Sequence, residues 1–345
     1  MAYTTIKKPS DYFNTKLYTG NGSTQAITSV NFQPDFTWLK RRDQTSFHYL
    51  FDSIRGVQKR LSSNSDTTEA TVSTSLTSFD SDGFTLGSEG DVNESGGTYA
   101  SWNWLASNTT ASNTDGSITS TVSANTTSGF SIVSYTGNGT AGATIGHGLG
   151  TAPGMIITKT RSTARNWRVY HKGLGATFGM ILNDTSIKDD DNTAWNDTEP
   201  TSSVFSVGTS VTTNDNGATM IAYCFADVKG FSKFGSYTGN GNADGTFIYT
   251  GFAPQYVLLK RTDSADGWWI IDNKQANPYP NPNVQLLVAD TNGIDNSSVS
   301  PFIDILSNGF KLRSSWAGVN ASGGSYIYMA FAEEPLVGDN PATAR

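Results

Sequence analysis

The sequence is short of charge, of cysteine and of long apolar runs, and each shortage excludes a class of protein. Asp, Glu, Lys and Arg make up only 15% of the 345 residues, and 30 acidic side chains against 23 basic ones argue against a general nucleic-acid binder with a basic face. The single cysteine, Cys224, excludes an internal disulfide framework, and its apolar neighbours predict a buried, inert thiol. No apolar run reaches the roughly 18 residues of a membrane span and no signal peptide is recognisable, so we expect assembly in a cytoplasm without membrane insertion.

What the sequence does have is turn residues and aromatics. Gly contributes 35 residues, Ser, Thr and Asn are abundant, and aromatic residues reach 12%, which is too many for a disordered chain. Helical periodicity is nearly absent, whereas short β-branched and aromatic runs alternate with Asn-Gly and Asp-Gly turns. These features predict an all-β fold.

The pentapeptide Tyr-Thr-Gly-Asn-Gly occurs three times, and other residues keep fixed distances from it. A proline follows each tyrosine by 16 to 18 residues, a lysine lies six residues after each proline, and a polar residue ends an aromatic-rich run eighteen residues after it. Such spacing indicates a triplicated unit of roughly 100 residues. Its motif residues, which we expect to be structural, are Tyr18, Gly20, Gly22, Pro34, Lys40 and Asp52, then Tyr135, Gly137, Gly139, Pro153, Lys159 and His171, then Tyr237, Gly239, Gly241, Pro254, Lys260 and Asp272.

The repeats predict three tandem antiparallel β-sandwiches of jelly-roll-like type. The predicted organisation is an N-terminal leader (1–12), repeat 1 (13–107), a Ser/Thr/Asn-rich connector (108–129), repeat 2 (130–229), repeat 3 (230–336) and a C-terminal tail (337–345). The connector fits either a flexible linker or an edge strand, and its β-branched run from Ser117 favours the strand.

The repeated lysines have two interpretations. Lys40, Lys159 and Lys260 could each face the polar residue that ends the next strand, as a structural cross-strand pair. The alternative, a shared catalytic lysine–carboxylate pair, is disfavoured because the second copy has a histidine in place of the aspartate. We therefore predict no catalytic residues.

Two tryptophans lie in polar stretches, where an exposed indole would need a reason. Trp195 and Trp316 are the candidate binding residues, for sugar stacking or a subunit contact. The three histidines form no metal-binding pattern, so the sequence predicts neither a metal site nor a cofactor. Ca²⁺ at the acidic loops 188–192 and 290–295 is the alternative, although neither loop matches a twelve-residue calcium loop.

The motifs also carry a resemblance. The pentapeptide, the stretch from Gly146 to Lys159 and the run from Leu306 to Arg313 resemble a tandem-repeat domain of unknown function found in structural, tail-fibre-like proteins of aquatic tailed phages. Nearly the whole chain is covered. The second repeat departs most, since it lacks the Asp-Gly or Asn-Gly turn before Phe205.

The resemblance implies a non-enzymatic component of the virion exterior, tail-associated and binding the host surface. The partners it implies are other virion proteins, a host cell-surface glycan and further copies of the chain in a homo-oligomer. A capsid decoration or head-fibre protein is the structural alternative, and a glycan depolymerase is the enzymatic one. Whether the three units form a ring or a string is left open by the sequence.

Overall fold

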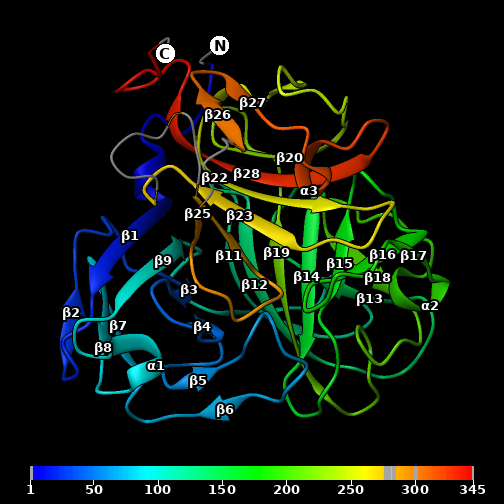
Figure 1. Cartoon of the computed structure of the whole chain (residues 1–345). Helices are drawn as coiled ribbons and strands as arrows, with labels where there is room; N and C mark the ends of the chain where they lie inside the picture. Colours follow the sequence, from blue (N-terminus) through cyan, green and yellow to red (C-terminus); the bar gives the residue numbers. More distant parts are fainter. Residues whose placement is uncertain (1–2, 276–280, 282–284, 298–301, 344–345) are drawn as a thin grey trace.

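The computed structural model describes residues 3–275, 281, 285–297 and 302–343 (Figure 1). Strands account for 43% of the described residues and helices for 5%, and the sheets are antiparallel. The predicted all-β fold is confirmed. Among the described residues no helix is long and apolar enough to span a membrane.

We describe the chain by three segments, 13–107, 130–229 and 230–336, each with its own sheets. The first follows the 3-10 helix Pro9–Asp11 and contains β1 (Phe13–Thr19), β2 (Gln25–Ile27), β3 (Phe36–Arg41), β4 (His48–Asp52), β5 (Lys59–Arg60), β6 (Ala70–Thr71), β7 (Leu76–Asp80), β8 (Gly83–Leu86), α1 (Gly90–Asn93) and β9 (Thr98–Trp104). The connector contributes β10 (Ala111–Asn113) and β11 (Ser120–Asn125), and the latter pairs with the first strand of segment 2.

Segments 2 and 3 continue in a similar order. Segment 2 contains β12 (Phe130–Thr136), β13 (Ala143–Gly146), β14 (Met155–Thr160), β15 (Arg168–His171), β16 (Phe178–Ile181), β17 (Asp189–Asp190), α2 (Asn192–Trp195), β18 (Val204–Val207) and β19 (Thr219–Phe225). Segment 3 contains β20 (Ser232–Thr238), β21 (Phe247–Tyr249), β22 (Phe252–Arg261), β23 (Trp268–Asp272), β24 (Gln285–Val288), β25 (Asn296–Ser297), β26 (Ile303–Leu306), β27 (Gly309–Leu312), α3 (Ala317–Asn320) and β28 (Ser325–Pro335).

Each segment contains one larger and one smaller sheet, and segment 1 also contains the two-stranded sheet β5-β6. The larger sheets share four strands in one order, with the last strand of the segment between the first and third: β1-β9-β3-β4, then β12-β19-β14-β15, then β20-β28-β22-β23. The second sheet is extended by β10 and β11 at one edge and by β16 and β17 at the other, and the third by β24 and β25. The smaller sheets are β2-β8-β7, β13-β18 and β21-β27-β26. The strand order of the larger sheets thus recurs along the chain.

The larger sheets bury both faces, because side chains alternate between two cores. In β19, Ile221, Tyr223 and Phe225 enter a central cluster, whereas Met220 and Cys224 enter a cluster formed by segment 2 and the connector. Strands β9 and β28 also feed the central cluster, and segments 1 and 3 have their own peripheral clusters. The molecule therefore has one shared core and three outer ones, with the segments around a common centre (Figure 1).

One ring from the last strand of each larger sheet lies in the shared core. Trp104, Phe225 and Phe331 are each 1% exposed, and their ring centroids are 6.2 Å (Trp104–Phe225), 5.7 Å (Trp104–Phe331) and 6.0 Å (Phe225–Phe331) apart. The interplanar angles of 63–73° correspond to the edge-to-face geometry that aromatic pairs prefer. We call these rings the aromatic triangle.

The chain ends also pack against the body. Ile6 of the predicted leader is buried in the central cluster, and the Asp339 amide donates to the Lys7 carbonyl at 3.1 Å. The predicted leader and tail thus lie side by side (Figure 1).

Because the three segments share this core, we expect them to unfold together. Phe331→Ala should lower the free energy of unfolding by about 3–5 kcal/mol, the usual cost of deleting a buried aromatic ring. Denaturant unfolding followed by tryptophan fluorescence and by calorimetry should show a single transition that shifts as a whole. Phe247→Ala removes a ring that is 43% exposed and should cost about 1 kcal/mol or less. Two separate transitions, with only one shifted, would contradict the shared core.

Candidate functional site

The repeated pentapeptide forms a turn that is held by a buried asparagine. In segment 2, the Tyr135 hydroxyl donates to the Thr213 carbonyl at 2.6 Å, and the Asn138 amide donates to Asn214 Oδ1 at 2.8 Å. Asn214 Nδ2 in turn donates to the Thr140 and Gly208 carbonyls at 3.0 and 2.8 Å. Asn93 and Asn320 make the equivalent contacts in the other segments.

Glycine is required at the two glycine positions of the pentapeptide for different physical reasons. A Cβ on Gly137 would lie 2.3 Å from the Asp215 carbonyl oxygen, so this position must approach the asparagine loop without a side chain. Gly139 has φ of +65°, in the left-handed region that L-residues rarely adopt. The two glycines of the motif are therefore explained by packing and backbone geometry.

Sequence reasoning missed the three asparagines. The signal was present, because each begins a similar pentapeptide: Asn93-Glu-Ser-Gly-Gly, Asn214-Asp-Asn-Gly-Ala and Asn320-Ala-Ser-Gly-Gly. Asparagine a few residues before glycine is typical of an exposed turn, whereas these three residues are all 0% exposed.

The repeated lysines are buried and donate to the neighbouring segment. Lys40, Lys159 and Lys260 are 0–1% exposed. Their ammonium groups donate to the carbonyls of Asn292, Asp66 and Thr185, at 3.4, 3.1 and 3.1 Å respectively. Segment 1 thus binds segment 3, segment 2 binds segment 1, and segment 3 binds segment 2.

Burial lowers the pKa of each lysine to about 8. The predicted cross-strand pair is wrong, because Lys40 lies opposite His48 in the β3–β4 ladder while Asp52 lies opposite Phe36. The third copy has the same register, with Lys260 opposite Trp268 and Asp272 opposite Tyr256.

Each acceptor carbonyl belongs to a strap that lies against the next segment. We call residues 62–69, 181–188 and 288–295 straps 1, 2 and 3. In strap 1, the Asp66 carbonyl also accepts from the Arg165 amide at 3.0 Å, and the Glu69 amide donates to the Arg161 carbonyl at 2.9 Å. The corresponding pairs are Asp266–Thr185 and Lys188–Thr262 at strap 2, and Ser46–Asn292 and Asp295–Arg42 at strap 3.

A ring nitrogen marks each junction as well. Trp167 Nε1 donates to the Ser62 carbonyl at 2.7 Å and Trp268 Nε1 to the Ile181 carbonyl at 2.8 Å. The equivalent position in segment 1 is His48. Its Nδ1 accepts from Trp38 Nε1, so Nε2 carries the proton and donates to the Val288 carbonyl at 3.0 Å.

The polar residues that end the aromatic runs face a neighbouring segment in the opposite direction. Asp52 accepts from the Tyr223 hydroxyl of segment 2 at 2.7 Å, and His171 Nε2 lies 3.1 Å from the Tyr328 carbonyl of segment 3. Asp272 accepts from Thr15 Oγ1 at 2.5 Å and from Trp102 Nε1 at 2.9 Å, both of segment 1. Burial raises the pKa of Asp272 to about 6 and lowers that of His171 to about 4.

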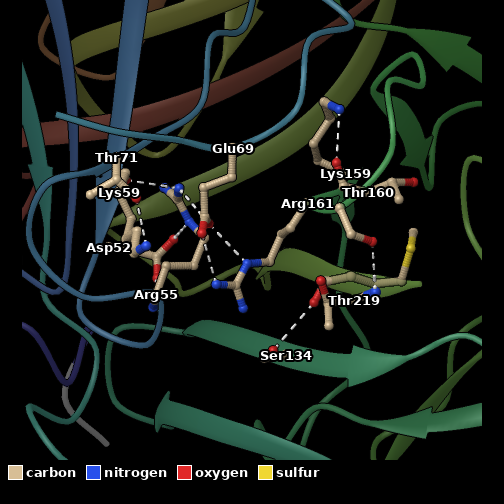
Figure 2. A network of polar contacts seen from close by, with 12 residues as sticks. Asp52, Arg55, Lys59, Glu69, Thr71, Ser134, Lys159, Thr160, Arg161 and Thr219 are labelled. Atoms are coloured by element: carbon tan, nitrogen blue, oxygen red, sulfur yellow. Dashed lines mark hydrogen bonds and ion pairs between the residues drawn. The ribbon is translucent and has the colours of Figure 1, made fainter. Parts of the chain in front are cut away.

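The junction between segments 1 and 2 carries an additional ion network. Arg55 forms an ion pair with Asp52 and lies 3.4 Å from the Glu69 carboxylate. That carboxylate also accepts hydrogen bonds from Nε and Nη2 of Arg161 at 2.9 and 3.0 Å. Figure 2 shows Glu69 between the two guanidinium groups, one from each segment.

The two predicted binding tryptophans have different positions. Trp195 is 1% exposed in α2 and packs edge-on against Tyr170 and Phe205, so the prediction of an exposed ring is wrong. Trp316 is 36% exposed, but its ring lies against Trp269 at 4.5 Å and Phe302 at 5.4 Å. Among the described residues, no group of three or more His, Cys, Asp or Glu side chains could hold a metal ion.

The acidic loops weighed for Ca²⁺ bind basic groups and amides instead. Asp189 and Asp191 pair with Arg168 at 2.9 and 3.0 Å. Asp290 accepts from the Trp268 amide at 2.7 Å, and Asp295 pairs with Arg42 at 2.6 Å.

An open groove of about 330 Å³ lies beside strap 1. Phe47, 43% exposed, forms one wall, with its ring 6.4 Å from that of Tyr49. The Arg60 guanidinium lies 4.4 Å from the Tyr49 ring centroid and contacts Asp91 at 3.1 Å and Glu89 at 3.7 Å. The remaining lining residues are Leu61, Ser62, Ser65, Thr67, Thr68 and Ala70.

The equivalent position in the other segments is occupied differently. Nine residues after the lysine, segment 1 has Tyr49, segment 2 has Arg168 and segment 3 has Trp269. Arg168 is engaged by two aspartates, and Trp269 is covered by Trp316. Segment 1 instead has the groove beside its ring. The three residues thus occupy equivalent strand positions, but their side chains and surroundings differ.

Comparison with known proteins gives a family. The chain belongs to DUF7483, a domain of unknown function, and the model of this family matches residues 8–335. One match thus spans all three segments, and its description mentions neither phages nor repeats. No curated protein and no solved structure matches the chain.

The turn geometry predicts a difference between glycines. Gly137→Ala should destabilise the protein by several kcal/mol or prevent folding, because the new methyl would overlap the Asp215 carbonyl. Gly90→Ala is the matched control, since its Cβ would meet nothing closer than 3.9 Å and the residue lies in α1. Thermal unfolding of both variants tests the difference, and equal melting temperatures would refute the packing explanation.

The buried carboxyl of Asp272 predicts a pH dependence. The folded protein keeps this proton up to about pH 6, whereas the unfolded chain releases it near pH 3.8, so stability falls as the pH rises through this window. In Asp272→Asn, the free energy of unfolding should fall by about 2–3 kcal/mol less across this pH window than in the wild type. Burial also raises the pKa of Asp290 to about 6. Asp290 therefore contributes the same pH dependence to the free energy of unfolding in the wild type and in Asp272→Asn.

Urea unfolding between pH 4 and 7 measures both slopes. Thr15→Val serves as a second variant: it removes a hydrogen bond that lowers the pKa of Asp272, so the window should extend above pH 6. Identical slopes in the wild type and Asp272→Asn would show that Asp272 does not titrate in this window.

Proposed function

We propose that the protein is a non-enzymatic structural component of a virion exterior, tail-associated and binding the host surface. In this proposal its three segments are tandem β-sandwich repeats that close into a pseudo-threefold ring. The observation that carries the proposal is the cyclic set of junctions: each strap contacts the next segment, and strap 3 returns to segment 1 through Ser46 and Arg42. A closed set of contacts leaves no loosely attached domain.

The fate of the motif residues supports a scaffold. The three repeated lysines are surrounded by carbonyl acceptors, and the repeated tyrosine hydroxyls donate to buried backbone. The lysine ammonium groups are thus used in joining the segments, and the tyrosine hydroxyls in fixing the turn within each segment. This use fits a protein that must persist outside a cell while its only cysteine, Cys224, is buried.

The resemblance to phage particle proteins supplies the location in this proposal. Of the motifs on which it rests, the pentapeptide forms the turn described above, and the stretch from Gly146 to Lys159 ends at a junction lysine. Three outer surfaces around one centre would also let weak contacts add up, which favours an attachment role.

The arrangement of three segments about one centre also fits the alternative proposal, a capsid decoration protein. Three segments with the same strand order about one centre would fit a threefold position on an icosahedral shell. In that setting the outer faces would contact shell proteins rather than a host.

Labelling of intact particles separates these locations. Antibodies raised against the purified protein should bind intact tailed phage particles that carry its gene, and electron microscopy should place the label at the tail. Label on the head would favour decoration of the shell. Absence of the protein from purified particles, checked by mass spectrometry, would overturn both structural proposals.

A further inference from the structure

We infer that the groove beside strap 1 binds a saccharide, with one sugar ring stacked on Phe47 and its hydroxyl groups held by Arg60 and the strap. The inference rests on the proposed attachment function and names the site and ligand class for it. It replaces Trp195, which is buried, and Trp316, which is packed against Trp269.

The groove has the composition that a sugar needs. Small-molecule sites combine apolar walls with a few well-placed polar groups, and about 330 Å³ is room for a single sugar ring. Phe47 supplies an exposed aromatic face for the C–H groups of such a ring, and Ser65 and Thr67 supply neutral hydroxyls.

Arg60 is held in place and still has donors to offer. Its guanidinium lies over Tyr49, and its contacts with Asp91 and Glu89 run through Nη1. Within the described part of the chain, no hydrogen bond or ion pair uses its Nε or Nη2, so both can donate to ligand hydroxyls. Because two carboxylates compensate its charge, the groove favours a neutral ligand over an anion.

The wall of the groove is already ordered without a ligand. Strap 1 is fixed by the hydrogen bonds of Asp66 with Lys159 and Arg165, and by that of Glu69 with Arg161. A preformed wall lowers the ordering cost of binding, which matters for a weak sugar contact. The contacts of strap 1 with segment 2 therefore also fix the shape of the groove.

The test compares two phenylalanines of equal exposure. Phe47 and Phe247 are both 43% exposed, but only Phe47 lines this groove. A glycan array with the whole protein identifies bound sugars, and titration calorimetry with a neutral hit measures affinity. Phe47→Ala should weaken binding at least tenfold, Arg60→Met should also weaken it, and Phe247→Ala should stay within twofold of wild type.

Thermal unfolding of each variant ensures that lost binding is not lost folding. No bound saccharide on the array, wild-type affinity in Phe47→Ala, or binding restricted to acidic sugars would overturn the inference. Particle labelling is independent of this result. A protein on the particle that binds no sugar refutes the groove alone, whereas sugar binding at Phe47 by a protein absent from particles refutes the virion proposal alone.

Discussion

The contact among Trp104, Phe225 and Phe331 is the constraint on which the other features depend. These rings come from the strands that lie in the middle of the three larger sheets, so their meeting fixes how the sheets face one another. Without the other two segments, the inner face of each larger sheet would expose a wide apolar surface to water. The segments are therefore parts of one folding unit, although each has a smaller sheet and an outer core of its own.

A shared apolar core does not by itself determine which segment lies beside which, because hydrophobic contact is non-directional. The buried polar groups provide that direction. The Lys159 ammonium donates to the Asp66 carbonyl, and Asp52 accepts from the Tyr223 hydroxyl. Separating these neighbours would remove buried hydrogen bonds between segments, at a cost of about 1–3 kcal/mol each. Burial makes each lysine easier to deprotonate, yet a pKa of about 8 keeps most of the ammonium groups charged at neutral pH.

The repeated spacing predicted the all-β fold and the positions of the residues that build the junctions, but not their partners. Lys40 and Asp52 lie on adjacent strands, and only the register of the hairpin, set by the loop between them, shows that they are not opposite one another. Trp195 was misplaced because Asn192, Thr193 and Asn196 suggest a polar loop, whereas α2 turns the indole inward onto Tyr170. Long-range acceptors such as the Asp66 carbonyl are backbone atoms, which leave no trace in the residue type.

The division between repeated and unlike positions bears on where function resides. The lysine and strap contacts recur in all three segments because each closes the same kind of junction, and the turn recurs because it fixes the same loop within each segment. Tyr49, Arg168 and Trp269 occupy equivalent strand positions on the outer side, where the junction contacts place no demand on them. One has a groove, one an ion cluster and one a second indole. A scaffold that is held together from within can carry unlike chemistry at equivalent outer positions, so a recognition site is more reasonably sought at these positions than at the repeated motifs.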